Sequence, residues 1–357
     1  MKKINQDIKC ASTLPGDFYS SDLIFKDVLN KIFATSWQFI SDDSLIQNNK
    51  DAYPFNFLDP VISEPLFFIN NNNHIDCFSN VCTHRGNILL DKPCKISSKI
   101  VCNYHGRTFD RCGNFFSMPE TTGMRDFPGK EDNLTSIPTQ SWRQFLFTSL
   151  DPLFPFNDYI MPIEERIGWM PIEEFKFRSD LSQEYVINAN WALYCDNYLE
   201  GFHIPFVHQD LSETLDYFNY DVELFKLTNL QIGIGKDDDD CFILPKESQD
   251  YGRKIAAYYF FVFPNLMLNF YPWGLSINIV KPISKTQTKI IFKSYVWDEK
   301  KLKIGAGADI NKVELEDEEI VQRVQKGVSS RYYKKGRFSP KMEQGVHHFH
   351  SLISKIY

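Results

Sequence analysis

The sequence predicts an α+β protein, with a small all-β domain followed by a larger domain that carries a long antiparallel sheet and helices. Two observations lead to this prediction. Short runs of β-branched and aromatic residues, separated by Gly, Asn and Asp, fill the stretch from about 53 to 150. Three longer strand-like runs lie nearer the C-terminus, at 255–263, 275–283 and 288–297, with helical patterns on either side of them.

Composition narrows the class of protein. Of 357 residues, 43% are apolar, with 31 Phe and 17 Tyr, so the chain has enough apolar surface for a sizeable core. The net charge of −7 and the pI near 5.7 argue against binding to nucleic acid or to an anionic membrane surface. No apolar run is long enough to span a bilayer, and the first residues lack the hydrophobic stretch of a secretory signal.

The first half of the chain shows one helical pattern followed by strands. Apolar residues at helical spacing predict an amphipathic helix over residues 22–34. The runs at 64–69 and 75–81 flank an Asn-rich turn at 71–74, which predicts a strand, a turn and a strand. We expect three further elements: a strand leading into a loop at 99–105, a hairpin at 108–117 with Gly113 in its turn, and a strand at 140–150.

The second half begins after a proline-rich connection. Pro152, Pro155 and Pro162 mark this connection, and a larger region follows it. A helix is expected from Trp191 onward, before the three long strands, and a final helix is expected at about 313–331. Eight cysteines in a chain of this length do not form a disulfide scaffold. Their spacing suggests metal ligation, and we therefore expect a location in the reducing cytoplasm.

Four metal-binding side chains fall in two short, similar motifs. The motif CTHRG spans 82–86 and the motif CNYHG spans 102–106, so a C-x-H half-site is paired with a C-x-x-H half-site. Two Cys and two His on loops of a β framework bind either one tetrahedral Zn²⁺ or a [2Fe–2S] cluster with two ligands on each iron. The glycine that ends each motif lets the backbone approach the metal and donate N–H groups to sulfide.

The pairing of C-x-H with C-x-x-H resembles the Rieske domain of ring-hydroxylating-type Rieske non-haem iron oxygenases. The resemblance implies that Cys82 and Cys102 hold one iron of the cluster, while His84 and His105 hold the other. The competing class of protein is not an oxygenase: it is a Rieske electron carrier or a binding protein stabilised by zinc.

The second loop departs from the family pattern at two positions. The family commonly reads C-P-Y-H-G-W, whereas here Asn103 replaces the Pro and Arg107 replaces the Trp. Neither residue is a ligand, so the implied set of ligands is intact. The expected consequence is a difference in the potential of the cluster or in the docking of a partner.

A second candidate site lies in the stretch CDNYLEGFHIPFVH, residues 195–208. Glu200 and His203 are three residues apart, a neighbour spacing on a helix, whereas His203 and His208 are five apart and would diverge by about 140°. Pro205 disfavours helix just before it, so we expect the helix to break directly after His203 and His208 to swing back. Two His with a carboxylate and open positions form the facial triad of non-haem Fe(II). The alternative is two ordinary histidines near a helix end.

Residues 190–208 also resemble the catalytic motif of the same family. The resemblance implies that His203 and His208 are ligands of a mononuclear iron. It further implies that Glu200 bridges toward the Rieske histidine of the neighbouring subunit, at a position where the family more often has Asp. Two further polar positions of the motif, expected around the iron, are Asp196 and Asn197.

The third ligand is expected on the C-terminal helix. Asp317 lies on the apolar stripe of that helix, and a carboxylate on a buried face needs a partner such as a metal ion. The family's ligand is likewise an Asp seven residues before a Val-Gln pair, which here is Val324-Gln325. Glu314 shares the face less centrally and is the alternative ligand. The stripe consists of Val313, Ile320, Val321, Val324 and Val328.

The resemblance covers nearly the whole chain and implies an oxygenase α subunit with a helix-grip catalytic domain. Its implied domains are an N-terminal helical segment at 1–40 that packs on the catalytic domain, a Rieske domain at 41–152 and a catalytic domain at 153–357. Electrons from NAD(P)H would arrive through a separate flavin and iron–sulfur reductase. They would cross between the subunits of a homotrimer, and the mononuclear Fe(II) would activate O₂. The implied path runs through His84 or His105 and Glu200.

The C-terminal half is most similar to the choline monooxygenase and carnitine oxygenase branch of the family, through residues 263–274 and 336–350. This branch implies hydroxylation or C–N cleavage of a small N-substituted substrate such as a quaternary ammonium compound, with hydroxylation of an aromatic ring as the alternative. We expect His347, His348 and His350 to be structural. Four aromatic residues are candidates for the substrate pocket, with ordinary core packing as the alternative: Phe202, Phe206, Tyr271 and Trp273.

Overall fold

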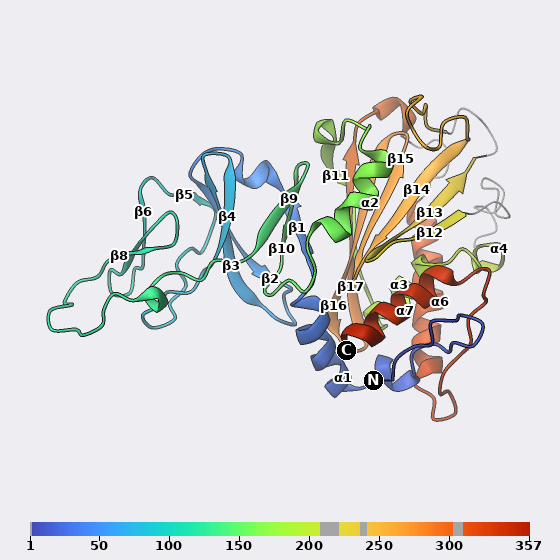
Figure 1. The fold of residues 1–357 in the computed structure, drawn as a ribbon, viewed down its shortest axis with the longest axis horizontal. Coiled ribbons are helices and arrows are strands. Elements are labelled where there is room, and N and C mark those ends of the chain that lie inside the picture. Colours follow the sequence, from blue (N-terminus) through green and yellow to red (C-terminus); the bar gives the residue numbers. More distant parts are fainter. Residues whose placement is uncertain (1, 208–220, 236–240, 303–309) are drawn as a thin grey trace. The chain divides into compact units, whose positions relative to one another are not determined.

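The computed structural model describes residues 2–207, 221–235, 241–302 and 310–357, with side chains from residue 316 onward in the last range (Figure 1). The chain divides into two compact units. One unit consists of residues 34–153, and the other combines residues 1–33 with residues 154–357. The first unit is built from β-strands and the second from an antiparallel sheet with helices, so the predicted α+β class is confirmed.

The 34–153 unit contains three small antiparallel sheets, with strand orders β1-β10-β9, β4-β3-β2-β5 and β6-β7-β8. The predicted turn at 71–74 and the hairpin around Gly113 are confirmed, and Gly113 has a φ of 78°. The strands are β1 (Gln38–Asp42), β2 (Asp51–Phe57), β3 (Glu64–Asn71), β4 (His74–Ser79), β5 (Cys94–Lys95), β6 (Lys99–Val101), β7 (Thr108–Asp110), β8 (Phe115–Ser117), β9 (Thr139–Trp142) and β10 (Phe145–Thr148).

The prediction of one strand over 140–150 is wrong. The segment folds back on itself as the hairpin β9–β10, in which Trp142 pairs with Phe145. The chain reverses at Arg143, whose φ of 53° lies in the left-handed region and cannot continue a strand. The run of apolar residues concealed this turn, because both strands of the hairpin carry buried aromatic side chains.

The other unit is organised around one antiparallel sheet with the order β11-β17-β16-β15-β14-β13-β12. The three long strands predicted from the sequence are β14, β16 and β17, and their predicted positions are confirmed. The strands are β11 (Lys176–Ile187), β12 (Asp221–Leu224), β13 (Thr228–Ile234), β14 (Ile255–Val262), β15 (Leu266–Tyr271), β16 (Gly274–Ser284) and β17 (Gln287–Val296).

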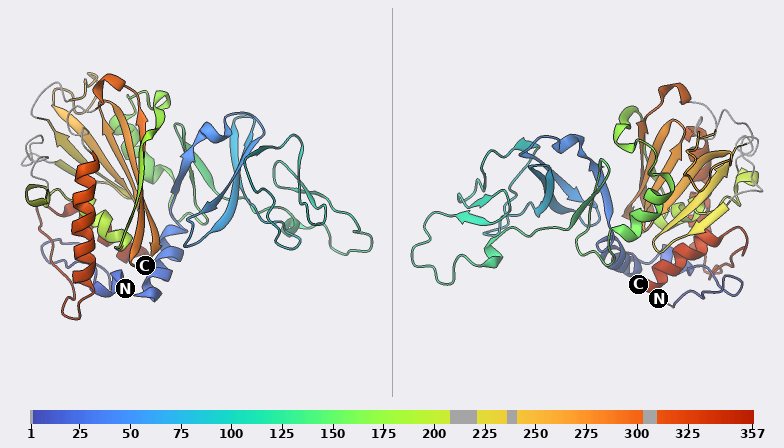
Figure 2. Two further views of the ribbon diagram at one scale, coloured as in Figure 1. Left: turned by 180° about the vertical axis from the view of Figure 1, so that it is seen from behind. Right: turned by 45° about the horizontal axis from the view of Figure 1, so that its top comes forward.

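Helices cover this sheet, and the long helix α6 runs beside it (Figure 2). Helix α3 packs against both α6 and β16, while α2 packs on β13 and α7 on β12. Helix α2 runs through Pro162, which the sequence had suggested as part of a connection. The helices are α1 (Asp22–Val28), which continues as a π-helical turn to Phe33, α2 (Asn157–Ile167), α3 (Trp191–Tyr198), α4 (Ile204–Val207), α6 (Ile310–Val328) and α7 (Gln344–Ile356).

The buried face of α6 differs from the predicted stripe at one position. Val321 and Val328 are buried as expected, but Val324 is exposed, and the neighbouring Gln325 is buried in its place. The buried amide is paired, because its Oε1 accepts the backbone N–H of Asn190 at 2.8 Å. Val313 and Glu314 lie in the part of α6 whose side chains the structure does not describe.

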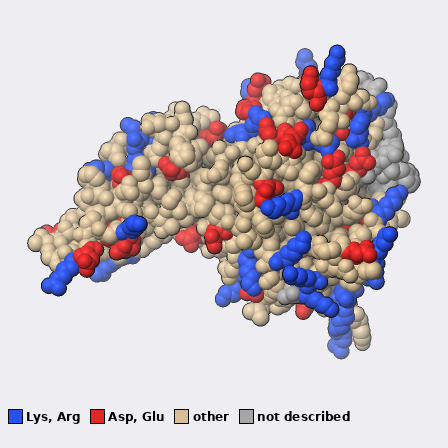
Figure 3. All heavy atoms as spheres, in the orientation of Figure 1, with Lys and Arg blue, Asp and Glu red and all other residues tan. Residues whose placement is uncertain are grey.

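Charged residues of both signs alternate over the face of the molecule shown in Figure 3. Within the described ranges, every helix is too short or too polar to cross a bilayer.

One buried ionic network fastens α2 to the sheet. The carboxylate of Asp250 accepts hydrogen bonds from Arg166 of α2 at 2.7 Å, from Tyr258 of β14 at 2.8 Å and from Arg253 at 2.8 Å. Burial alone would raise the pKa of Asp250, but the hydrogen bonds from Arg166 and Tyr258 lower it below the ordinary value. The network therefore stabilises the ionised form of a carboxylate that is 1% exposed.

We predict that Asp250→Asn lowers the free energy of unfolding by about 3 kcal/mol at pH 7, because two arginines then lose their buried partner. The folded-state pKa lies below the unfolded-chain value of 3.8, so this stabilisation is fully present above pH 3.8 and is lost as the pH falls through the folded-state pKa. Urea unfolding followed by Trp fluorescence measures the change.

Asp180→Asn is the matched control, because Asp180 pairs with Arg178 on the surface and should leave unfolding nearly unchanged. Equal effects of the two substitutions at pH 7 would contradict the prediction.

Candidate metal centres and their surroundings

The two Cys/His motifs form loops with the same backbone structure. The loop of CTHRG follows β4, and the loop of CNYHG follows β6. In each loop the Cys N–H donates to the carbonyl five residues later, and the Cys carbonyl accepts the N–H of the glycine four residues later. In the first loop the Cys82 N–H donates to the Asn87 carbonyl at 2.8 Å, and the Gly86 N–H donates to the Cys82 carbonyl at 3.0 Å. In the second loop the Cys102 N–H donates to the Arg107 carbonyl at 2.8 Å, and the Gly106 N–H donates to the Cys102 carbonyl at 3.0 Å.

Both glycines are required by the backbone. Gly86 has a φ of 70° and Gly106 a φ of 71°, a conformation that residues with a Cβ rarely adopt. At Gly106 an added Cβ would also stand 3.4 Å from the ring of Pro119. The motifs therefore fold into two equivalent loops, although the histidine stands at a different position in each.

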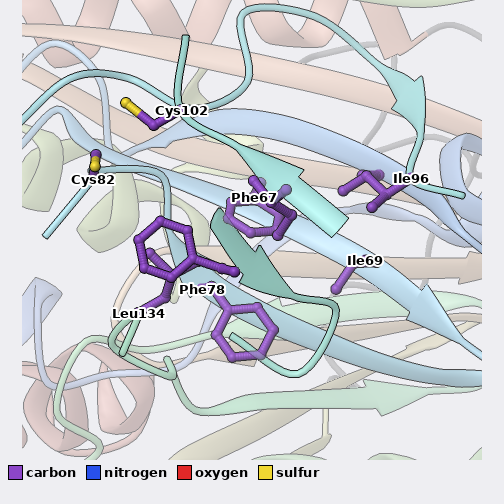
Figure 4. Close-up of a cluster of buried hydrophobic side chains, with 10 residues drawn as sticks. Phe67, Ile69, Phe78, Cys82, Ile96, Cys102 and Leu134 are labelled. Atoms are coloured by element: carbon purple, nitrogen blue, oxygen red, sulfur yellow. The ribbon is translucent and has the colours of Figure 1, made fainter. Parts of the chain in front are cut away.

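The four candidate cluster ligands come together. The buried Cys82 and Cys102 lie beside each other at one edge of an apolar cluster that includes Phe67 and Leu134 (Figure 4). The rings of the two histidines, His84 and His105, meet edge to face with their centroids 4.7 Å apart. The sequence prediction that these residues share one place is consistent with this geometry.

The chemistry of these side chains suits a [2Fe–2S] cluster. The Nδ1 of His84 is buried and has no hydrogen-bond partner among the described residues, so a metal ion would satisfy it. Burial alone would raise the pKa of Cys102, but N–H groups of Tyr104 and His105 lower it and so favour the thiolate that metals bind. In the described ranges, no three His, Cys, Asp or Glu residues converge on one ion, and a Rieske cluster needs only two on each iron.

Asn103, which stands where the family commonly has proline, connects the two loops. The side-chain amide of Asn87 in the first loop donates to Asn103 Oδ1 at 2.9 Å and reaches Cys102 Sγ at 3.6 Å. Tyr104 is exposed, and its ring lies over His105 with the centroids 3.7 Å apart.

The second candidate centre lies between α3 and α4. Helix α3 ends at Tyr198, so Glu200 and His203 lie in the turn that follows it. Pro205 is the second residue of α4, in the first helical turn, where a missing N–H costs nothing. The prediction that one helix carries Glu200 and His203 and breaks directly after His203 is therefore wrong. The carboxylate of Glu200 instead organises the turn by accepting the N–H of His203 at 3.1 Å.

His203 stands between two carboxylates. Its Nδ1 is 2.8 Å from Glu200 Oε1, and its Nε2 is 3.4 Å from Asp317 Oδ1 of α6. Two donors that bind one ion at about 2.1 Å, at right angles, stand about 3 Å apart, so the Nε2–Oδ1 distance suits a shared metal ion. His208 lies outside the described residues.

The charges around His203 favour a cation at this place. Burial alone would lower the pKa of His203, but hydrogen bonds with Asp317 and Glu200 raise it to about 9. The metal-free ring therefore carries a proton between the two carboxylates at neutral pH. A metal ion on Nε2 would replace that proton, while Glu200 would keep Nδ1 fixed.

Asp196 is held by residues that the sequence did not connect with it. Its carboxylate accepts the Tyr19 hydroxyl at 3.2 Å and lies 2.8 Å from Nε2 of the buried His350. The N–H of Leu14 donates to His350 Nδ1 at 3.1 Å, so the proton of the neutral ring is on Nε2 and is donated to Asp196. Asn197 follows on the same helix and is half-buried. Only the folded chain brings residues 14–19 and 350 to α3.

The four aromatic pocket candidates form two pairs. Phe202 and Phe206 meet edge to face at 6.4 Å, and both are exposed. Tyr271 and Trp273 are buried and stack at 5.3 Å, with Tyr259 edge-on to Tyr271 at 5.9 Å. The indole N–H of Trp273 has no hydrogen-bond partner within the described residues.

Comparison with known families gives two matches. Residues 36–128 match the Rieske [2Fe–2S] domain, and residues 174–357 match the catalytic domain of the ring-hydroxylating alpha subunit.

Relatives align with nearly the full chain. The choline monooxygenase of Arabidopsis thaliana is 27% identical, covering 96% of this chain and 82% of its own. The carnitine monooxygenase oxygenase subunit of Escherichia coli (strain K12) is 25% identical, covering 97% of this chain and 94% of its own.

Two solved structures share the fold. A quaternary ammonium Rieske monooxygenase superposes with a TM-score of 0.78 at 23% identity, covering 99% of each chain. Naphthalene 1,2-dioxygenase from Rhodococcus sp. gives a TM-score of 0.73 at 16% identity, covering 96% of this chain and 94% of that one.

Proposed function

This chain belongs to the ring-hydroxylating alpha-subunit family, and we propose that it is a terminal oxygenase acting on a small quaternary ammonium compound. It is an oxidoreductase of the Rieske oxygenase class, and its two domains imply a [2Fe–2S] cluster and a mononuclear iron as cofactors. The observation that carries the proposal is the position of His203, whose two ring nitrogens face carboxylates from separate parts of the chain.

We assign the cluster to the two equivalent loops, with Cys82 and Cys102 on one iron and His84 and His105 on the other. This assignment is supported by the proximity of the four side chains and by Nδ1 of His84, which finds no hydrogen-bond partner in the described parts of the chain. The predicted bounds of this domain, residues 41–152, are part of the proposal.

We assign the mononuclear iron to His203 and Asp317, together with His208. When bound, this iron with O₂ supplies the oxidising power that inserts oxygen into the substrate. Glu200 holds Nδ1 of His203 and so leaves Nε2 facing Asp317, where the iron would bind, and Asp196 keeps its orientation through Tyr19 and His350.

The electron path is proposed to cross a subunit boundary of a homotrimer, from a Rieske histidine to Glu200. The carboxylate of Glu200, partly exposed and 2.8 Å from Nδ1 of His203, would connect solvent with an iron bound at the other ring nitrogen, which supports the bridging role. A separate NAD(P)H-dependent reductase would deliver the electrons, and a cytoplasmic location is proposed for the complex.

The substrate class is proposed from the relatives, which are named for choline and carnitine. A quaternary ammonium group donates no hydrogen bond and is recognised through the faces of aromatic rings. Tyr259, Tyr271 and Trp273 form an aromatic group within a buried apolar cluster, and we propose that their ring faces line the substrate pocket.

We predict that the purified chain is red-brown and gives a Rieske-type EPR signal on reduction. Cys82→Ser should abolish both properties, because the cluster loses a thiolate. Cys112→Ser, at an exposed cysteine of the same unit, is the control and should keep them. A colourless protein that contains only zinc would overturn the proposed function.

Asp317→Ala should remove the mononuclear iron and keep the colour of the cluster. Turnover should fall by more than about 100-fold, because loss of a ligand costs more than loss of a residue that supports one. Iron analysis and product formation measure the two effects. Glu319→Ala, at an exposed position of the same helix, should change neither, and full turnover in Asp317→Ala would assign the ligand elsewhere.

The substrate class is tested with a surrogate reductase, by NADH-coupled product formation on a panel that includes choline, carnitine and naphthalene. We expect turnover of a quaternary ammonium compound. Its uncharged carbon isostere, 3,3-dimethylbutan-1-ol for choline, should react up to about 30-fold less efficiently, because the cation–π attraction of about 2 kcal/mol is lost. Oxidation of naphthalene without turnover of any ammonium compound would favour ring hydroxylation.

A further inference from the structure

A permanent positive charge is buried next to the second cluster loop. Arg107 directly follows Gly106, and its carbonyl accepts the N–H of Cys102 at 2.8 Å, so it belongs to the frame of the loop. Its side chain is 3% exposed. Arginine stays protonated at any pH that a folded protein experiences, so this charge is fixed.

Asp132 balances this charge and joins the two loops. Its Oδ1 lies 2.5 Å from Arg107 Nη2, and its own carbonyl accepts that same Nη2 at 3.1 Å. The carbonyl also accepts the hydroxyl of Thr83, the residue between Cys82 and His84, at 2.8 Å. One residue therefore connects the first loop to the second, and the N–H of Gly129 fixes its carboxylate from the other side at 2.7 Å.

The guanidinium also contacts a thioether and three aromatic rings, and its Nη1 donates weakly to Met118 Sδ at 3.9 Å. Its Cζ lies 4.8 Å from the ring centroid of Phe115, 5.6 Å from that of Phe127 and 5.8 Å from that of Phe109. Its Nε has no hydrogen-bond partner among the described residues. In such surroundings a charge acts over longer distances than in water.

Stability alone does not explain the pair. Replacing a buried ion pair with apolar side chains of similar volume is often neutral or stabilising. An electrostatic role is favoured because the two charges have opposite signs and stand at the base of the loops that carry the four ligands.

We propose that the charges of Arg107 and Asp132 together set the reduction potential of the cluster. The inference rests on the proposed function in one respect, that a [2Fe–2S] cluster binds between the loops. Reduction adds one electron from an external donor and breaks no covalent bond, so the cluster gains one negative charge. The guanidinium favours that reduced state, and the carboxylate disfavours it.

The experiment is a redox titration of the full-length holoprotein with dithionite and mediators, followed by the visible spectrum and EPR. Arg107→Met should lower the midpoint potential, and Asp132→Asn should raise it. We expect each change to alter the reduction equilibrium by about tenfold, which is about 59 mV for one electron. The midpoint potential of the double variant should return toward the wild-type value. Arg107→Lys keeps the positive charge, so its midpoint potential should stay closer to the wild-type value than that of Arg107→Met.

Opposite signs separate an electrostatic role from a structural one, because loosening of the loops would shift both single variants in the same direction. Arg85→Met is the matched control: it removes the same charge beside His84, but from an exposed side chain, and should shift the potential much less. An equal shift for Arg85→Met, or shifts of equal sign for the two single variants, would overturn the inference.

The metal-free chain provides a readout without the cluster. Thermal unfolding of the apo double variant should stay close to that of the apo wild type, and a large loss of stability there would show a structural role instead. Absence of any cluster from the wild-type chain would refute the proposed function. A wild-type cluster whose potential ignores both charges would refute this inference alone.

Discussion

The proposed iron site depends on the imidazole of His203, which faces a carboxylate at each of its two nitrogens. Glu200 fixes Nδ1 from the turn after α3, and Asp317 faces Nε2 from α6. Because the two acids belong to different elements, the ring is oriented only when α3 and α6 pack together, and α3 in turn packs on β16. The large sheet therefore supports the ring through α3, which carries the contact with α6.

In the 34–153 unit, backbone hydrogen bonds rather than side chains position the candidate ligands. The two Cys/His loops place histidine at different distances from cysteine, yet they share the same hydrogen bonds and the same left-handed glycine. The backbone frame thus fixes the cysteines, while the different spacing brings the two rings together edge to face. A substitution at either glycine would disturb a cysteine four residues away.

Much of this arrangement follows from the sequence, because strand runs, helical stripes and metal motifs are local patterns. The long strands β14, β16 and β17 and the approach of Asp317 to His203 were predicted on that basis. The predictions were wrong where tertiary contacts overrode a local sequence pattern. Val324 is exposed while its neighbour Gln325 is buried and bonded to Asn190, and the turn between α3 and α4 is organised by the carboxylate of Glu200. Contacts such as Tyr19 with Asp196 join segments too distant for any periodic pattern.

The division of the second unit between residues 1–33 and 154–357 has a consequence for synthesis on the ribosome. Leu14 leaves the ribosome early, but the ring that it orients belongs to His350, near the end of the chain. Every strand of the 34–153 unit has been made long before that histidine appears. The N-terminal segment therefore lacks its partner His350 through most of translation. The contacts that support Asp196 are the last part of the proposed site to form.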